Sequence, residues 1–213
     1  MSVDIRFISN FLNRDSVEGP RQFVGYIPCW IRGTCHKKSQ NFKGLPNQKP
    51  EDYEAMGGSG VTIATGCDMG QTDEITLREY GVRPELISIL SPYIGLKTNA
   101  AIRKLSQMPL RITPADAEHL DNCVHAGYLN RYVRPAYDKA SNVKFDDLPK
   151  AAQAAVFSLC FQKGCGGVRR DWPMTWHCLT NQNWSGAAHE LKTGFRQYAK
   201  RRWVEGKLLE ELL

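Results

Sequence analysis

The chain has 213 residues, which is enough for one well-buried domain or two small ones. Because 42% of the residues are hydrophobic and 23% are charged, the composition is that of a globular protein and excludes a disordered one. Lys and Arg number 28 against 22 Asp and Glu, a formal charge of +6, which favours an anionic partner: nucleic acid, a membrane surface or cell wall. No segment approaches the roughly 18 consecutive apolar residues of a membrane span.

Residues 1–20 predict a first helix that ends near Gly19-Pro20, because proline cannot continue a helix. Polar residues such as Asp4 and Asn10 interrupt its apolar part and no small-residue cleavage site follows, so this segment does not resemble a signal peptide. We therefore expect synthesis in the cytoplasm. To act in the periplasm or cell wall, the protein would be delivered by a secretion system, by uptake or with a holin.

Residues 21–72 are rich in Gly, Pro, Asn and Ser and predict a small, irregular sheet. Its β-prone pieces are residues 23–27 and 60–65, and a long connection over 32–58 separates them. A connection of that length inside a compact domain is usually functional or an insertion.

From about residue 73 the pattern is helical to the end. Thr113-Pro114 marks a clear helix start, with Thr113 as N-cap, and that helix is expected to run to about Asp138 with a break near Pro135. Residues 146–164 are apolar almost all round, which predicts a central buried helix closed by Gly164. The other expected helices cover residues 76–80, 83–89, 99–107 and 187–213.

Seven cysteines are too few and too unevenly spaced for a disulfide scaffold, although Cys29 and Cys35 can close a short loop in an oxidising compartment. No C-x-x-C is present and the spacings fit no zinc template, so we predict no metal and no cofactor. A zinc site would have to combine Cys29, Cys35 and His36 with Cys165, His177 and Cys178.

The most informative segment is G-S-G-V-T-I-A-T-G-C-D-M-G-Q over residues 58–71, in which glycines surround a short strand and leave its backbone accessible. Strand alternation places Thr62 and Ala64 on one face. Asp68 follows in a turn, where its carboxylate can face a cleft. The alternative is that Asp68 only closes the turn with an Asx hydrogen bond.

Four motifs together resemble the pesticin-type branch of the phage lysozymes, which cleave peptidoglycan glycans by an inverting muramidase mechanism. They are E-G-x-x-x-x-x-G-Y-I-P over 18–28, the glycine-flanked T-x-x-x-x-x-D element ending at residue 68, L-P-x-x-x-Q-x-A-V-F-S-L-C-F-Q-K-G over 148–164 and R-R-x-x-E-G-x-L-L over 201–209. The resemblance implies a lysozyme-like α+β fold. We expect one domain over 1–213, with a β lobe at 21–72 and a mostly helical lobe at 73–213 that includes the helix 1–19.

The resemblance also implies roles for individual residues. Glu18 matches the general acid, Asp68 the carboxylate that activates water, and Thr62 the hydroxyl that holds this water. Tyr26 and Gln71 match positions near the substrate cleft, although packing explains Tyr26 equally well. Gln162 either hydrogen-bonds in the core or reaches the cleft floor. The segment between Glu18 and Thr62 is longer than in the family, with extra residues over 29–57.

These roles agree with the chemistry of glycoside hydrolysis, in which a protonated carboxyl donates to the leaving oxygen and an ionised one activates water. The end of a helix and partial burial disfavour ionisation of Glu18, whereas Asp68 lies among backbone N–H groups in a wetter turn. If the enzyme inverts, the two carboxyls are expected roughly 6.5–9.5 Å apart.

Other candidates carry less weight. A tryptophan cluster in a helical lobe is more often core than a sugar platform, and Cys67 has no histidine at a spacing typical of a Cys–His hydrolase. The basic residues of the last helix can contact phosphates, form a solvated face or attract anionic cell wall. The residues concerned are Trp172, Trp176 and Trp184, and Arg196, Lys200, Arg201, Arg202 and Lys207 beside Trp203.

We therefore predict hydrolysis of the β-1,4 bond between N-acetylmuramic acid and N-acetylglucosamine, by an antibacterial toxin, a secretion-system effector or a phage endolysin. The expected partners are peptidoglycan strands and an immunity protein, with no nucleic acid and no membrane span, and the chain is expected to be a monomer. The alternatives are a hydrolase of chitin-type glycans and a non-catalytic, basic module that binds cell wall or nucleic acid.

Overall fold

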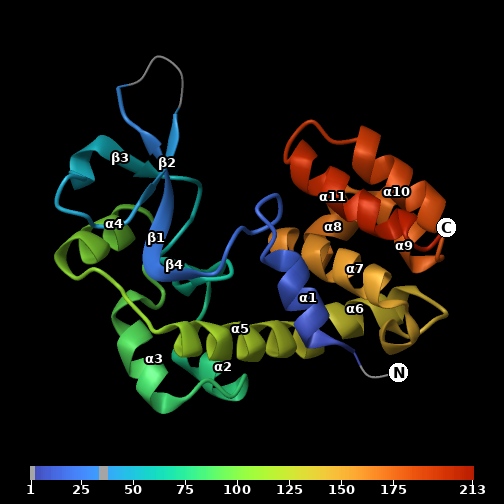
Figure 1. Ribbon diagram of the computed structural model, residues 1–213, viewed down its shortest axis with the longest axis horizontal. Helices are drawn as coiled ribbons and strands as arrows, with labels where there is room; N and C mark the ends of the chain where they lie inside the picture. Colours follow the sequence, from blue (N-terminus) through green and yellow to red (C-terminus); the bar gives the residue numbers. More distant parts are fainter. Residues whose placement is uncertain (1–2, 34–37) are drawn as a thin grey trace. The chain divides into compact units, whose positions relative to one another are not determined.

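The computed structural model describes residues 3–33 and 38–213. They form two compact units, each with its own hydrophobic core: one comprises Met1–Pro20 and His125–Leu213, the other Arg21–Val124. The first is helical, and the second combines a small antiparallel sheet with helices (Figure 1). We call them the helical unit and the sheet unit. Whether they amount to one domain stays a prediction.

The sheet is built around β1 (Gln22–Ile31), which is longer than the strand expected at 23–27. All pairings are antiparallel, and the strand order is β2-β1-β4-β5, with β3 also on β1. Ile27 and Cys29 are fully buried and alternate along the second half of β1. This alternating burial explains why the strand continues beyond the expected end. The other strands are β2 (Ser39–Phe42), β3 (Tyr53–Ala55), β4 (Thr62–Ala64) and β5 (Cys67–Asp68).

The length and composition of residues 32–58 predict a long connection without strands. The structure has two strands there, β2 and β3, and a short 3-10 turn, η1 (Pro50–Asp52). The rings of Phe42 and Tyr53 lie 5.0 Å apart between centroids and are both buried. This aromatic pair gives the segment an apolar anchor that the polar composition conceals.

Helices pack with the sheet in the same core, so residues 73–124 belong to the sheet unit. The sequence pattern predicts them as part of the helical lobe. Asp73 caps α2 (Glu74–Glu79) by accepting from the Thr76 N–H at 2.7 Å. As predicted, Thr113 caps α5 (Pro114–Tyr128) by accepting from the Asp116 N–H. The helices and 3-10 turns concerned are η2 (Met69–Gln71), α2 (Glu74–Glu79), α3 (Pro84–Leu90), η3 (Ser91–Tyr93), α4 (Thr98–Gln107) and the first part of α5 (Pro114–Tyr128).

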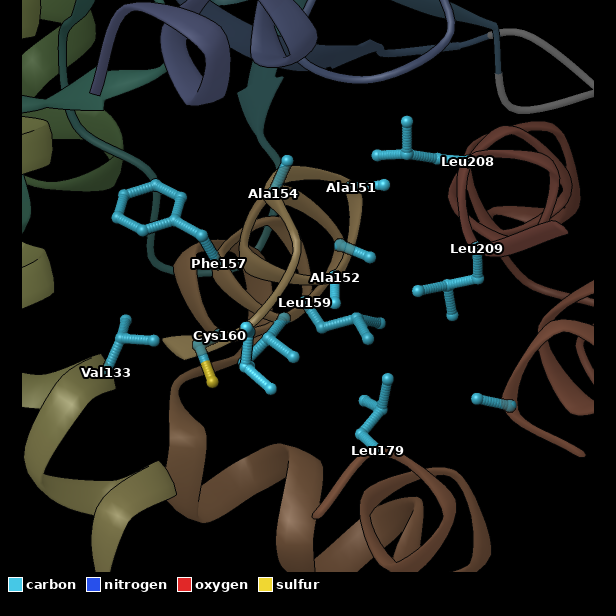
Figure 2. Close-up of a cluster of buried hydrophobic side chains, with 14 of the residues drawn as sticks. Val133, Ala151, Ala152, Ala154, Phe157, Leu159, Cys160, Leu179, Leu208 and Leu209 are labelled. Carbon is cyan, nitrogen blue, oxygen red and sulfur yellow. The ribbon is translucent and has the colours of Figure 1, made fainter. Parts of the chain in front are cut away.

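The helical unit is built around α7 (Lys150–Lys163), which confirms the predicted central helix. Every residue from position 151 to 160 is buried, and Gly164 closes the helix with φ +74°. Figure 2 shows Val133, Leu179, Leu208 and Leu209 on other elements surrounding its side chains. The helix has no polar face because neighbours cover it all round.

Two helix predictions in this unit are wrong. The first helix, α1 (Ile5–Leu12), ends well before Gly19-Pro20, because residues 13–18 fold back in turns and the Glu18 N–H donates to the Leu12 carbonyl at 3.0 Å. The single terminal helix is instead two, α10 (Trp184–Thr193) and α11 (Ala199–Glu210), and two helices before them were missed, α8 (Cys165–Asp171) and α9 (Pro173–Thr180).

The break predicted near Pro135 is present. A π-helical turn, η4 (Leu129–Val133), follows α5 and precedes α6 (Arg134–Ala140), and a 3-10 turn, η5 (Phe145–Asp147), leads into α7. Proline has no N–H to donate and crowds the preceding turn, so the α-helical hydrogen-bond pattern changes just before it.

Candidate active site

Three of the predicted site residues form a row across the sheet unit. Thr62 on β4 is the register partner of Tyr26 on β1 and of Asp68 on β5. Register partners in antiparallel strands carry their side chains on the same face, so the Thr62 side chain lies between those of Tyr26 and Asp68. We call Tyr26, Thr62 and Asp68 the sheet row. Asp68 therefore lies in a short strand, one step earlier than the turn expected from the sequence.

Backbone N–H groups hold the Asp68 carboxylate. Its Oδ1 accepts from the N–H of Gly70 at 2.8 Å and of Gly60 at 3.1 Å, while Oδ2 lies 3.2 Å from the same Gly60 nitrogen. The Gly70 bond is the local cap that the Asx alternative predicted, but the Gly60 bond comes from the other side of the hairpin. Oδ1 is therefore occupied by two donors, and Oδ2 is the oxygen with more capacity to accept a proton.

The Asp68 site is drier than expected. Burial raises the pKa of the Asp68 carboxyl above its usual range, and this outweighs the Gly60 and Gly70 N–H groups and the Lys97 ammonium, which lower it. The exposed Gln71 contributes to the same surroundings: its amide donates to the Gly58 carbonyl at 2.8 Å and its Oε1 accepts from Lys97 at 3.1 Å. Gln71 thus lies beside the carboxylate, and its contact with substrate stays a prediction.

Close backbone packing explains the glycines around the row. A Cβ on Gly60 would lie 2.5 Å from the Leu96 carbonyl oxygen and 2.6 Å from the Gly70 nitrogen. A Cβ on Gly70 would lie 2.6 Å from the same oxygen. Only glycine permits three backbone segments to approach this closely, and that approach is what brings the Gly60 N–H to Asp68.

A buried carboxylate that the sequence analysis missed supports the β4–β5 hairpin. Asp121 on α5 is fully buried and accepts from the Thr65 N–H at 2.9 Å, the Thr65 hydroxyl at 2.6 Å and Arg21 Nε at 2.7 Å. Since Thr65 lies in the turn of this hairpin, Asp121 fixes the strands that carry Thr62 and Asp68. A charged residue on the apolar side of a helix was the available sequence signal.

In the helical unit, Glu18 lies in the turns after α1 and its carboxylate pairs with a guanidinium. Arg201 NH1 donates to Glu18 Oε1 at 2.5 Å and also lies 3.4 Å from the Val17 carbonyl oxygen. The predicted effect of a helix end on Glu18 does not apply, because α1 ends six residues earlier. The negative end of a helix dipole was expected beside this carboxyl, and a cation from α11, of opposite sign, lies there instead.

Arg201 belongs to a buried group of charges that we call the arginine cluster, comprising Arg201, Arg202 and Glu205; the Ser158 hydroxyl contacts Arg201 and Glu205. Arg202 and Glu205 are fully buried and Arg201 nearly so. Two of the five cations predicted to form a solvated or phosphate-binding face therefore turn inward, so the expected basic surface of the last helix is weaker than the sequence indicates. The i,i+4 spacing of Arg201 and Glu205 is the signal that would have predicted this pairing.

Gln162 and the tryptophans have structural surroundings in this unit. Gln162 on α7 is half-buried and its Oε1 accepts from Arg202 NH2, which agrees with the core alternative; contact of Gln162 with substrate stays a prediction. Trp176 is buried, and Trp172 packs edge-on against Phe195 at 5.1 Å. Both belong to or pack against the core, as expected of a tryptophan cluster.

Neither Cys67 nor Ser9 is accessible as a nucleophile. Cys67 is buried and its Sγ lies 3.8 Å from Asp121. In the helical unit, Ser9 Oγ lies 2.8 Å from His125 Nδ1, but both residues are buried and Phe157 and Phe161 face the imidazole edge-on. A substrate carbonyl has no access to either group.

The thiol and metal predictions concern residues that the structure describes only in part. Cys29 is buried, and burial raises the pKa of its thiol to about 11; Cys35 and His36 lie outside the described residues. Within 3–33 and 38–213, no three His, Cys, Asp or Glu side chains are grouped to hold a metal ion. In the same ranges, no helix has the length and apolar character to cross a membrane.

A helical unit with a central buried helix, and a small antiparallel sheet that presents a carboxylate, define an α+β protein of the lysozyme-like class. The family model described as "Pesticin: Bacterial toxin homologue of phage lysozyme, C-term" matches residues 36–185. The chain belongs to this family. No curated protein matches it. Thr62, Asp68, Gln71 and Gln162 lie inside the matched region, whereas Glu18 and Tyr26 precede it.

Proposed function

We propose that the protein is a peptidoglycan hydrolase that cleaves the β-1,4 bond between N-acetylmuramic acid and N-acetylglucosamine by an inverting mechanism. The observation that carries the proposal is the sheet row, in which a half-buried Asp68 stands beside the Thr62 hydroxyl in a chain of the lysozyme-like toxin family. At the coarser level of its family, the chain is a lysozyme-like protein of glycoside-hydrolase type.

In this mechanism Asp68 is the base. Its Oδ1 is held by the Gly60 and Gly70 N–H groups, so Oδ2 takes the proton of a water molecule as the water attacks the anomeric carbon. Thr62, the register partner of Asp68, is placed to bind the same water through its hydroxyl. Fixing the water between two groups removes the entropy cost of positioning it during the reaction.

Glu18 is the acid in this proposal and gives its proton to the oxygen of the departing sugar. Its carboxyl is one-fifth exposed, so it can reach substrate, and Arg201 fixes its orientation at 2.5 Å. After cleavage, the ionised carboxylate is left next to a guanidinium, which stabilises the product state of the proton transfer. An inverting reaction requires the two carboxyls to act on opposite faces of one sugar ring.

The stereochemistry of the product tests the reaction. On purified peptidoglycan, proton NMR of the first released reducing ends should show the α-anomer, because a single displacement inverts the β bond. Chitin oligomers serve as the second substrate. An initial β-anomer contradicts the inverting mechanism. Faster cleavage of chitin than of peptidoglycan contradicts peptidoglycan as the substrate. Salt-sensitive binding without new reducing ends contradicts hydrolysis.

Substitution of Lys97 should change the pH dependence in a direction fixed by the pKa of Asp68. The Lys97 ammonium lowers that pKa against the effect of burial, so Lys97→Met should raise it. A base must be ionised, and therefore the acidic limb of the kcat/KM profile should move to higher pH by a few tenths of a unit. The shift should shrink in about 1 M salt, because Lys97 is exposed. The matched control is Lys104→Met in α4, the helix that Lys97 precedes; a limb that moves to lower pH contradicts the prediction.

The setting that this activity favours is antibacterial. A family of bacterial toxins related to phage lysozyme suits a toxin or secretion-system effector better than a phage endolysin. In that role the protein would act on the wall from the periplasm after delivery, with an immunity protein protecting the producing cell. Expression directed to the periplasm of a sensitive host should lyse the cells, while cytoplasmic expression should not; equal toxicity from both would contradict this setting.

A further inference from the structure

Glu205 is a fully buried carboxylate in the helical unit that the proposed reaction does not use. Its Oε1 accepts from the Ser158 hydroxyl at 2.6 Å and from Arg201 Nε at 3.2 Å, and its Oε2 lies 2.9 Å from Arg202 NH1. A buried charge is costly unless it is paired. Here burial raises the pKa of Glu205 above its usual range, although both guanidinium groups and the Ser158 hydroxyl lower it.

The Arg201 guanidinium connects this interior carboxylate to Glu18. Its Nε faces Glu205, its NH1 faces Glu18 at 2.5 Å, and its NH2 donates to the backbone carbonyl and the hydroxyl of Ser158, both at 3.0 Å. Each of its three nitrogens therefore has an acceptor, and the planar group has no freedom to turn. One arginine thus bridges a carboxylate that is 0% exposed and one that is 20% exposed.

The charge of the whole group depends on the proton of Glu18. With Glu18 ionised, two guanidinium groups are balanced by two carboxylates. With Glu18 protonated, as the reaction requires, the two guanidinium groups and the Glu205 carboxylate leave one net positive charge. Without Glu205 the net positive charge would be two. Two cations of the neighbouring helices have partners outside the cluster: Lys192 of α10 pairs with Glu210, and Lys163 of α7 pairs with Asp171.

The other polar groups around the cluster do not change this balance. Ser158 and Gln162 come from α7 and are uncharged, and the face of the Trp172 ring lies 5.0 Å from the Arg202 guanidinium carbon. Burial lowers the pKa of Arg202, and Tyr198, which precedes α11, is one of the groups that raise it. The cluster is therefore an almost closed set in which Glu205 supplies the compensating negative charge.

We infer that Glu205 is a positioning residue that acts through Arg201 and sets the pH range over which Glu18 can carry the proton it donates. The inference rests on the proposed function, because it needs Glu18 to be the acid. Without the negative charge of Glu205, two guanidinium groups would act on Glu18 alone and hold it ionised at lower pH.

The test is the pH profile of kcat/KM on dye-labelled peptidoglycan for Glu205→Gln in the full chain. The alkaline limb, which reports the acid, should move to lower pH by about one unit, with activity recovered at the acidic end. Arg202→Gln removes a cation instead and should move the limb to higher pH. The double variant Arg202→Gln/Glu205→Gln restores the balance and should return the limb to the wild-type position.

The matched control is Glu210→Gln, which removes a carboxylate of the same helix that pairs with Lys192 and Lys207 and should leave the limb unchanged. A purely structural role for Glu205 would lower the melting temperature or the rate at every pH without moving the limb. If Glu205→Gln does not fold, the opposite shift in Arg202→Gln and its reversal in the double variant decide the question.

The inference is overturned if the limb stays in place in the folded variants, or if none of the three cluster variants folds. The proposed function fails differently: Glu18→Gln would then keep its activity. An inactive Glu18→Gln together with an unmoved limb in Glu205→Gln would reject the role of Glu205 alone.

Discussion

Asp68→Asn and Glu18→Gln should each lower the rate of peptidoglycan clearing by about 10²–10⁴-fold while the protein stays folded. Asn at position 68 can still accept from the Gly70 N–H, but it cannot take a proton from water at neutral pH. Gln at position 18 can still accept from Arg201, but it has no proton of carboxylic acidity to donate. The measurements are turbidity clearing of purified peptidoglycan, and circular dichroism with a thermal melt.

Two conservative variants control for the loss of charge. Asp73→Asn changes the cap of α2 to another good capping residue a few positions after Asp68, and Asp15→Asn changes an exposed residue in the same turns as Glu18. Both should keep wild-type activity. If Asp68→Asn or Glu18→Gln retains more than about a tenth of the activity, the role assigned to that residue is wrong.

Gly60→Ala should destabilise the sheet unit by about 3 kcal/mol, which lowers the melting temperature by roughly 6–12 °C, and should abolish most of the activity. The new methyl group would lie 2.5–2.6 Å from backbone atoms of Leu96 and Gly70, and backbone cannot move aside as a flexible side chain can. Since the displaced segment carries the N–H that binds Asp68, the loss of stability and of activity should occur together.

Gly58→Ala is the matched control, two residues earlier in the same segment. The nearest heavy atom to a Cβ there is Gln71 Nε2 at 3.9 Å, an ordinary contact. This variant should melt within about 2 °C of the wild type and keep its activity. Equal destabilisation by both substitutions would show that close packing at Gly60 is not what holds the Asp68 hairpin.

The local patterns were informative where one residue type or one apolar run decided the structure. The central helix, the Thr113 cap and the break before Pro135 were all predicted, because each depends on neighbours within a few positions. The first helix was predicted too long because a polar stretch after Leu12 has no strong terminator of its own. The strands within residues 32–58 were missed because their buried rings are isolated among polar residues.

The amino-acid order alone was enough to predict the α+β class and the family resemblance, and to single out Glu18, Thr62 and Asp68 as candidate site residues. Their surroundings came from folding, because these depend on partners distant along the chain: the Gly60 N–H on Asp68, Asp121 on the hairpin, and Arg201 on Glu18. The inward turn of Arg201 and Arg202 is the clearest case. A helix rich in cations predicts a solvated face, and only the packing of α11 against α7 buries those charges and obliges a carboxylate to accompany them.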